Sequence, residues 1–215
     1  MTAVKRILSI VLTLGVGLAS AAFADSLDFV QATGDLGSTS HAYSLDGVGV
    51  TVTGFNGGDL FATYRGADED GIGLAGDPSN EHEIFIGKPG GPTPFIQLDM
   101  SKLIKAGFTN FQFMMSSTQG KEMWQASACP TTGMLCSNAH SLTSSSQNLL
   151  SAPVNLSAAD PFLDISMAPG ATSGNVLVLE VDAKSATSSV PEPATLGLLG
   201  LGLAGIGFAG RRRKN

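Results

Sequence analysis

The feature that most limits how this chain can fold is an uninterrupted apolar segment near its C-terminal end. The segment runs from Ala194 to Gly210 and contains 17 residues without a charged side chain. As a helix it would be roughly 26 Å long at about 1.5 Å per residue, close to the roughly 30 Å thickness of a bilayer core. We therefore expect one transmembrane helix over 194–210, separate from the folded part of the chain.

The residues on either side of this segment differ sharply. Before it stand Val190, Pro191, Glu192 and Pro193, and after it Arg211, Arg212, Arg213, Lys214 and Asn215. Positive residues stay on the cytoplasmic side, so 211–215 is expected inside and the proline motif outside. The prolines stop the helix from extending through the motif, which leaves the motif extended and accessible. A permanent anchor is the alternative, but the six glycines in 194–210 weaken the helix and favour a segment that is later removed.

The ordered combination of a Pro-Glu-Pro motif, an apolar helix and a basic end resembles the C-terminal sorting signal of PEP-CTERM proteins. The resemblance covers 191–215, with the motif at 191–193. It implies that a membrane enzyme, exosortase, recognises the motif and removes the helix and the basic end. It also implies an intermediate tethered to the inner membrane, and then a cell-surface or extracellular protein associated with exopolysaccharide, biofilm or floc matrix.

The N-terminal end has the pattern of a secretory signal peptide. Its parts follow one another in the expected order: Lys5 and Arg6, an apolar stretch from Ile7 to Leu18, and the small residues Ala22 and Ala24. Cleavage after Ala24 would give a mature chain that begins at Asp25. The apolar stretch is short for a membrane span, although an uncleaved N-terminal anchor is the alternative.

Removing both ends leaves about 165 residues, which is enough for one domain with a hydrophobic core. The expected organisation is a signal peptide at 1–24, an ectodomain at 25–184, a linker of small residues at 185–190 and the sorting signal at 191–215. Six of the 12 basic residues lie in the two terminal segments, but only one of the 18 acidic residues does, so residues 25–190 carry a net charge of −11. A domain this acidic is not expected to bind nucleic acid.

The two cysteines, Cys129 and Cys136, flank a short segment that contains Pro130 and Gly133. In an exported protein such a pair indicates one local disulfide that closes a loop. The spacing does not fit a Cys-x-x-Cys redox motif, and two cysteines without nearby histidines do not form a zinc site. We therefore expect a structural bridge.

Low charge content, abundant Gly, Ser and Thr, and short apolar runs between turns indicate strands. Alternation within 48–53 places Val48, Val50 and Val52 on one face. The other candidate strands are 60–64, 84–86, 95–98, 108–115, 121–127, 162–167 and 176–182. Strands at this spacing predict an all-β fold, an antiparallel β-sandwich or jelly-roll-like ectodomain. The one helical signal is a short turn from Ser101, as N-cap, to Gly107.

The densest group of acidic residues lies between positions 68 and 83. The candidate calcium ligands in it are Asp68, Asp70, Asp77, Glu81 and Glu83. Carboxylates on glycine-flanked loops are ligands that calcium prefers, and Glu81 and Glu83 would share one face of a strand. The spacing does not fit an EF-hand. The alternative is a solvated acidic loop that protects a sheet edge from aggregation. No other cofactor is expected.

The sequence contains no Gly-x-Ser-x-Gly elbow, His-Glu-x-x-His motif, phosphate-binding loop or dinucleotide fingerprint. The three histidines, His41, His82 and His140, are far apart in the sequence. Glu83 and Glu122 are carboxylates of the type that a glycosidase needs, but an acidic chain always contains such candidates. We therefore expect no enzymatic activity.

Three hypotheses for the function remain. The favoured one is an exported, non-catalytic protein of the surface or extracellular matrix, processed by exosortase. The second is a calcium-dependent or carbohydrate-binding β-sandwich module. Its aromatic candidates are Tyr43, Tyr64 and Trp124, although a single Trp in an apolar strand is more typical of a core. The third is a secreted polysaccharide hydrolase.

Overall fold

Thirteen strands and one short helix make up the part of the chain that the structure describes. The structure is a computed structural model that describes residues 25–29, 34–65, 69–118, 122–136, 142–145, 148–172 and 174–185. The strands are β1 (Asp25–Asp28), β2 (Gly34–Asp35), β3 (Ser40–Leu45), β4 (Val48–Phe55), β5 (Leu60–Tyr64), β6 (Asp70–Leu74), β7 (Ile84–Phe85), β8 (Phe95–Asp99), β9 (Phe108–Ser116), β10 (Trp124–Cys129), β11 (Leu142–Ser144), β12 (Phe162–Met167) and β13 (Asn175–Ser185). The helix is α2 (Ser101–Lys105).

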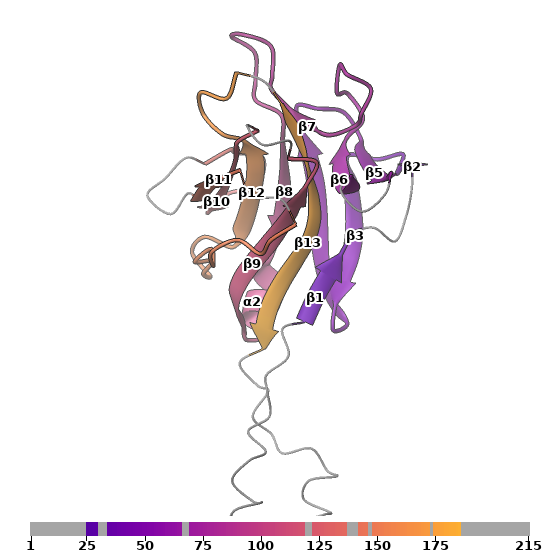
Figure 1. Cartoon of the computed structure of the whole chain (residues 1–215). Coiled ribbons are helices and arrows are strands. Elements are labelled where there is room, and N and C mark those ends of the chain that lie inside the picture. The colour runs from indigo at the N-terminus through magenta and orange to yellow at the C-terminus, as the bar shows by residue number, and fades with distance from the viewer. Residues whose placement is uncertain are drawn as a thin grey trace, which may run out of the picture. The chain divides into compact units, whose positions relative to one another are not determined.

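The strands pair in two antiparallel sheets (Figure 1). The first sheet has the order β1-β13-β6-β5-β2, and β7 and β9 also pair with β13. The second sheet has the order β11-β10-β12-β8-β4-β3. Strand β13 is antiparallel to β1, β6, β7 and β9, so the first sheet is assembled around it.

Alternating side chains give the second sheet an apolar inner face and a polar outer face. In β4, Val50 and Val52 are buried in the core, as predicted from their spacing. Thr53 follows Val52 in the strand and therefore points to the outer face. It pairs there with Gln97 of β8. The polar outer face is where the disulfide loop is attached.

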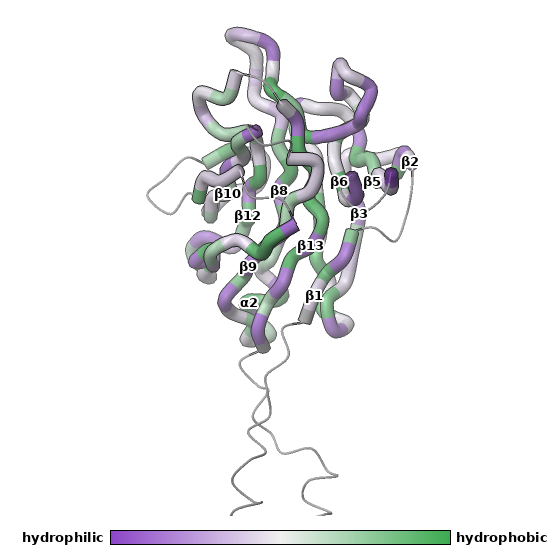
Figure 2. Tube along the Cα trace, viewed as in Figure 1, coloured by the Kyte–Doolittle hydropathy of each residue, from purple (hydrophilic) through white to green (hydrophobic). Residues whose placement is uncertain are grey.

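One hydrophobic core includes residues from both sheets. Phe113 of β9 and Trp124 of β10 are both fully buried, and their rings meet edge to face with centroids 5.1 Å apart. The strand β8 is largely apolar, β13 is apolar in its first half and mixed in its second, and several connecting loops are polar (Figure 2). The all-β prediction is confirmed, with two antiparallel sheets on one core. The comparison with a jelly roll stays a prediction.

The predicted strands at 60–64 and 162–167 have the expected bounds, as β5 and β12. The predicted N-cap of the short helix was wrong. The cap is Met100, without a side-chain hydrogen bond, and the Ser101 N–H donates to Asp99 Oδ1 at 3.0 Å. Gly107 does follow the helix as expected, with φ +91°.

Both terminal segments lie outside the described residues. This applies to the signal peptide at 1–24 with its cleavage residues Ala22 and Ala24, and to the sorting signal at 191–215. Among the residues that the structure does describe, no helix has the length and hydropathy needed to cross a bilayer. Strand β13 continues to Ser185, the first residue of the predicted linker.

Candidate functional site

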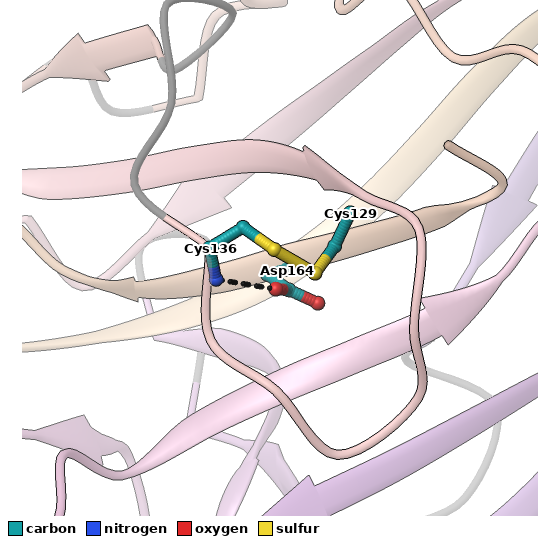
Figure 3. A group of neighbouring side chains, drawn as sticks. All are labelled: Cys129, Cys136 and Asp164. Carbon is teal, nitrogen blue, oxygen red and sulfur yellow. Dashed lines mark hydrogen bonds between the residues drawn. A yellow bond between two sulfur atoms is a disulfide. The ribbon is translucent and has the colours of Figure 1, made fainter. Parts of the chain in front are cut away.

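A disulfide closes a loop beside the polar face of the second sheet (Figure 3). Cys129, the last residue of β10, is bonded to Cys136, and their Cα atoms are 5.6 Å apart. The predicted bridge is therefore confirmed. Asp164 of β12 lies next to it, and its Oδ2 accepts a hydrogen bond from the Cys136 N–H at 3.0 Å.

Two buried side chains, Gln97 and Asp164, attach this loop to the sheet. Gln97 Nε2 donates to Asp164 Oδ1 at 2.6 Å and to the Thr131 carbonyl at 3.3 Å. Gln97 Oε1 accepts from the Gly133 N–H at 3.0 Å. Burial raises the pKa of Asp164 to about 6, although the hydrogen bonds from Gln97 and Cys136 lower it. Both polar groups of Gln97 are thus used in holding the loop.

Cys129, Cys136 and Asp164 also form the one group of potential metal ligands found among the described residues, with ligand atoms within 4.8 Å of one another. The two sulfurs are bonded to each other, however, and the thiolate is the form of cysteine that binds a metal. The arrangement fits a structural staple.

The predicted calcium ligands Asp77, Glu81 and Glu83 lie on the loop between β6 and β7. The Asp77 carboxylate accepts hydrogen bonds from the Ser79 hydroxyl at 2.7 Å, the Ser79 N–H at 2.9 Å and the Glu83 N–H at 3.3 Å. Burial raises the pKa of Asp77, but these bonds and one from Asn175 outweigh burial and leave the pKa below its usual value. Asp77 therefore orders the loop as a carboxylate.

Glu83 is the most buried acid of this loop, with 1% of its surface exposed. Its Oε1 accepts a hydrogen bond from the Ser117 hydroxyl at 2.7 Å, whereas its buried Oε2 has no partner among the described residues. Burial raises the pKa of Glu83 to about 7, and the charges of Glu81, Asp77 and Glu122 add to the increase. The interpretation as a solvated loop is wrong for Asp77 and Glu83, although Glu81 is exposed.

The other expectations for this loop need correction. Glu81 and Glu83 do not share a strand face, because Asn80 and His82 have φ values of 65° and 62° and the segment from 75 to 83, between β6 and β7, is not part of a strand. Asp70 has different contacts in β6, where its Oδ1 accepts the Arg65 N–H at 3.1 Å. Asp68 lies outside the described residues.

Sequence reasoning missed the residues that complete this cluster. Asn175 Nδ2 donates to Glu81 Oε2 at 2.8 Å and to Asp77 Oδ2 at 3.4 Å, across more than 90 positions of sequence. Ser117 is also remote, and no motif links either residue to the loop. Within the described residues, no three acidic or histidine side chains here bring their ligand atoms within 4.8 Å of one another. The cluster is thus organised by neutral donors.

The aromatic candidates separate into core and surface. Trp124 is fully buried, which confirms the interpretation that it belongs to the core, and Tyr43 is partly buried with a buried hydroxyl, so these two rings do not form a sugar-stacking platform. Burial raises the pKa of Tyr43 to about 12. Tyr64 is 62% exposed, at the end of β5.

Comparison with known proteins identifies a feature at the C-terminal end of the chain. Residues 189–214 match the family model described as the PEP-CTERM protein-sorting motif. No curated protein and no solved structure gives a significant match.

Proposed function

Because residues 189–214 carry a PEP-CTERM protein-sorting motif, which indicates an exported protein processed by exosortase, we propose that the β-rich domain is a non-catalytic component of an extracellular matrix. Its partner there is an exopolysaccharide of the cell surface or biofilm. The sorting motif is the observation that carries this proposal.

Each part of the tail has one task in this proposal. The apolar segment at 194–210 holds the chain in the inner membrane, and the basic residues at 211–214 keep that end in the cytoplasm. The motif at 191–193 then lies on the outer side, within reach of exosortase. Cleavage releases the domain to the surface or the medium.

The described domain has properties that suit this role. Its high negative charge favours solubility in a hydrated polymer. Two of its buried polar side chains, Gln97 and Asp164, bond to each other. Glu83 and Glu122, the two carboxylates considered for a hydrolase, do not form an open site, because Glu83 is 1% exposed and bonded to Ser117. These features favour a binding or structural protein over an enzyme.

Replacement of Pro191, Glu192 and Pro193 by alanine tests the role of the tail. We expect the variant to keep residues 194–215 and to remain in the membrane fraction, because exosortase no longer recognises it. Cell fractionation and immunoblotting measure this distribution, with Ser188→Ala as the control just outside the matched motif. Release of the triple variant at the wild-type level would contradict the proposal.

Calcium binding at the acidic loop is a second proposal, favoured by the buried Glu83 Oε2 that has no partner among the described residues. A cation held by Asp77, Glu81 and Glu83 would compensate the repulsion among these carboxylates. Calcium would replace Asn175 Nδ2, which donates to Glu81 Oε2 at 2.8 Å, as the partner of this carboxylate.

We expect millimolar calcium to raise the melting temperature, because a ligand of the folded state stabilises it by about 2.7 kcal/mol at 100 times its Kd. Thermal unfolding with calcium, with magnesium and with a chelator measures the effect. Glu83→Gln should abolish the calcium shift, and Asp46→Asn, on an exposed turn, should keep it. A wild-type protein without any shift would rule out the site.

A further inference from the structure

Strand β3, at one edge of the second sheet, has a long side that no described strand pairs with (right side of Figure 1). Its one partner in the sheet is β4. The strand is six residues long, Ser40–Leu45, and contains neither a charged residue nor a proline. Natural proteins blunt sheet edges with short strands, charges, prolines or covering loops, because an open edge is a template for another strand. Strand β3 is thus neither shortened nor charged.

The other described edges of the two sheets are short, charged or covered. Strands β2 and β7 have two residues each, and β11 has three. Strand β1 has four residues, of which two are aspartates. Strand β9 is covered by a neighbouring segment, in which the N–H groups of Asn148, Ser151 and Val154 donate to carbonyls of β9. Among the edges that the structure describes, β3 is therefore the exception.

The pairing of β3 with β4 determines which of its backbone groups face outward. The Gly54 N–H donates to the Thr39 carbonyl at 2.8 Å, at the start of this ladder. Hydrogen-bonded and non-hydrogen-bonded pairs alternate along an antiparallel ladder, so the odd-numbered residues of β3 bond to β4. The even-numbered residues therefore direct their N–H and C=O groups away from β4. These residues are Ser40, Ala42 and Ser44, and all three are exposed.

The free side of β3 is complementary to the same side of a second copy in antiparallel orientation. With Ala42 of the two copies opposite each other, a twofold axis passes between them, and Ser40 of each copy faces Ser44 of the other. Opposing residues then lie on the same face of the sheet and exchange N–H···O=C bonds. The N–H groups of Ala42 and Ser44 have no acceptor among the described residues. The Ser40 N–H would exchange its local bond to Ser38 Oγ for one across the interface.

The side chains of β3 suit this pairing on both faces of the sheet. On the outer face, the small side chains of Ser40, Ala42 and Ser44 leave room for a second strand. On the other face, His41 of one copy lies opposite Tyr43 of the other, in non-hydrogen-bonded pairs whose side chains come closest. The same two rings already meet edge to face within one chain, with centroids 4.9 Å apart. Aromatic cross-strand pairs stabilise antiparallel sheets.

We propose that two copies of this protein associate through β3, which joins their six-stranded sheets into one continuous sheet. Residues 25–190 carry a net charge of −11, but 36–45 contain no charged side chain, so the copies meet where neither is charged. The contact involves one strand per copy, fewer than the roughly 20 residues per partner of a stable interface, so the dimer is weak and reversible. This association goes beyond the proposed function, because it requires neither a polysaccharide nor removal of the tail.

Cysteine cross-linking of the full-length chain in detergent tests the register, with the wild type as the control. Ala42→Cys places one thiol on each side of the twofold axis, with Cα atoms about 5.5 Å apart, which a disulfide can span. We expect this variant to form covalent dimers under mild oxidation, measured by non-reducing electrophoresis. Ser40→Cys and Ser44→Cys should each give little dimer alone but should cross-link when mixed. Equal cross-linking of all three variants alone, or none by Ala42→Cys or the mixture, would overturn the proposal.

Two lysine variants measure the association without a cross-link. Ala42→Lys places two like charges opposite each other and should weaken dimerisation at least about tenfold. Thr143→Lys adds the same charge at an exposed position of β11, another edge of the same sheet, and should associate like the wild type. Sedimentation equilibrium in density-matched detergent measures the Kd, and thermal unfolding checks that both variants fold. Equal association of the two variants, as contact through 194–210 alone would give, or a monomeric wild type would refute the β3 interface.

Salt provides an independent readout of the same interface. Both domains are acidic, and the proposed contact contains no ion pair. Raising sodium chloride from about 50 to about 500 mM should therefore screen the repulsion between the copies and lower the Kd of the dimer. A Kd that rises with salt would show that ion pairs hold the copies together and would contradict association through β3.

Discussion

At the scale of single residues, the domain keeps carboxyl groups in its interior without ionic partners. Glu83 and Asp164 are each 1% exposed, and neither forms an ion pair within the described part of the chain. Their hydrogen bonds come from uncharged donors, the Ser117 hydroxyl and the Gln97 amide. Burial is the main cause of their raised pKa values, about 7 for Glu83 and about 6 for Asp164. Both acids therefore hold a proton more tightly in the folded state than in the unfolded state.

We predict that the domain is more stable near pH 5 than near pH 8. The pKa of Glu83 rises from 4.5 in the unfolded chain to about 7 on folding. Its contribution to the free energy of unfolding is thus greatest below pH 4.5 and is lost as the pH rises through about 7. Asp164 acts in the same direction up to about pH 6. Asp77 acts oppositely, because its pKa is lowered, but its contribution is lost only below its unfolded value of 3.8.

Melting temperatures between pH 4.5 and 8 measure this dependence. Glu83→Gln keeps the size and most hydrogen-bonding capacity of the side chain but removes its titration, so its curve should be flatter. Asp46→Asn changes an exposed carboxyl on the β3–β4 turn and should leave the slope as in the wild type. A wild-type stability that rises from pH 5 to pH 8 would show that the buried acids do not dominate.

Among the elements, β4 and β6 show what a local sequence pattern can and cannot predict. Strand β4 was found because Val50 and Val52 repeat every second residue. Strand β6 was not predicted, because Gly71 and Gly73 have no side chain that could show an alternating pattern. Its strand conformation is stabilised by pairing with β5 and β13. The disulfide was predictable from two cysteines in an exported chain. Its attachment to Gln97 was not, because Gln97 lies 36 positions from Gly133.

The loop from Cys129 to Cys136 allows a prediction at this scale. Replacing both cysteines by serine should lower the free energy of unfolding by about 2 kcal/mol, because the short loop loses its constraint in the unfolded chain. The bonds from Gln97 and Asp164 should keep the loop attached, so the variant should still fold.

Urea unfolding measures this change, and the wild type under reducing conditions serves as the matched comparison. The reduced wild type and the double variant should have the same midpoint. An unchanged midpoint in both would mean that Gln97 and Asp164 alone hold the loop.

At the scale of the whole molecule, the sequence determines where the chain is sent more clearly than what its domain binds. The sorting signal is contiguous, so its order can be read directly from 189–214. The candidate sites are not contiguous. Asp77 meets Asn175, and Arg65 reaches the carbonyl of Glu81, only after the sheets have formed. Such contacts depend on strand pairing that local patterns do not specify.

If the tail is a temporary anchor, as we propose, the intact mass of the protein recovered outside the cell will show that it has been removed. We predict a chain that begins at Asp25 and lacks residues 194–215, with any additional mass due to attached glycans. A mass that includes Ala194 to Asn215 would contradict processing by exosortase and would make the tail a permanent anchor.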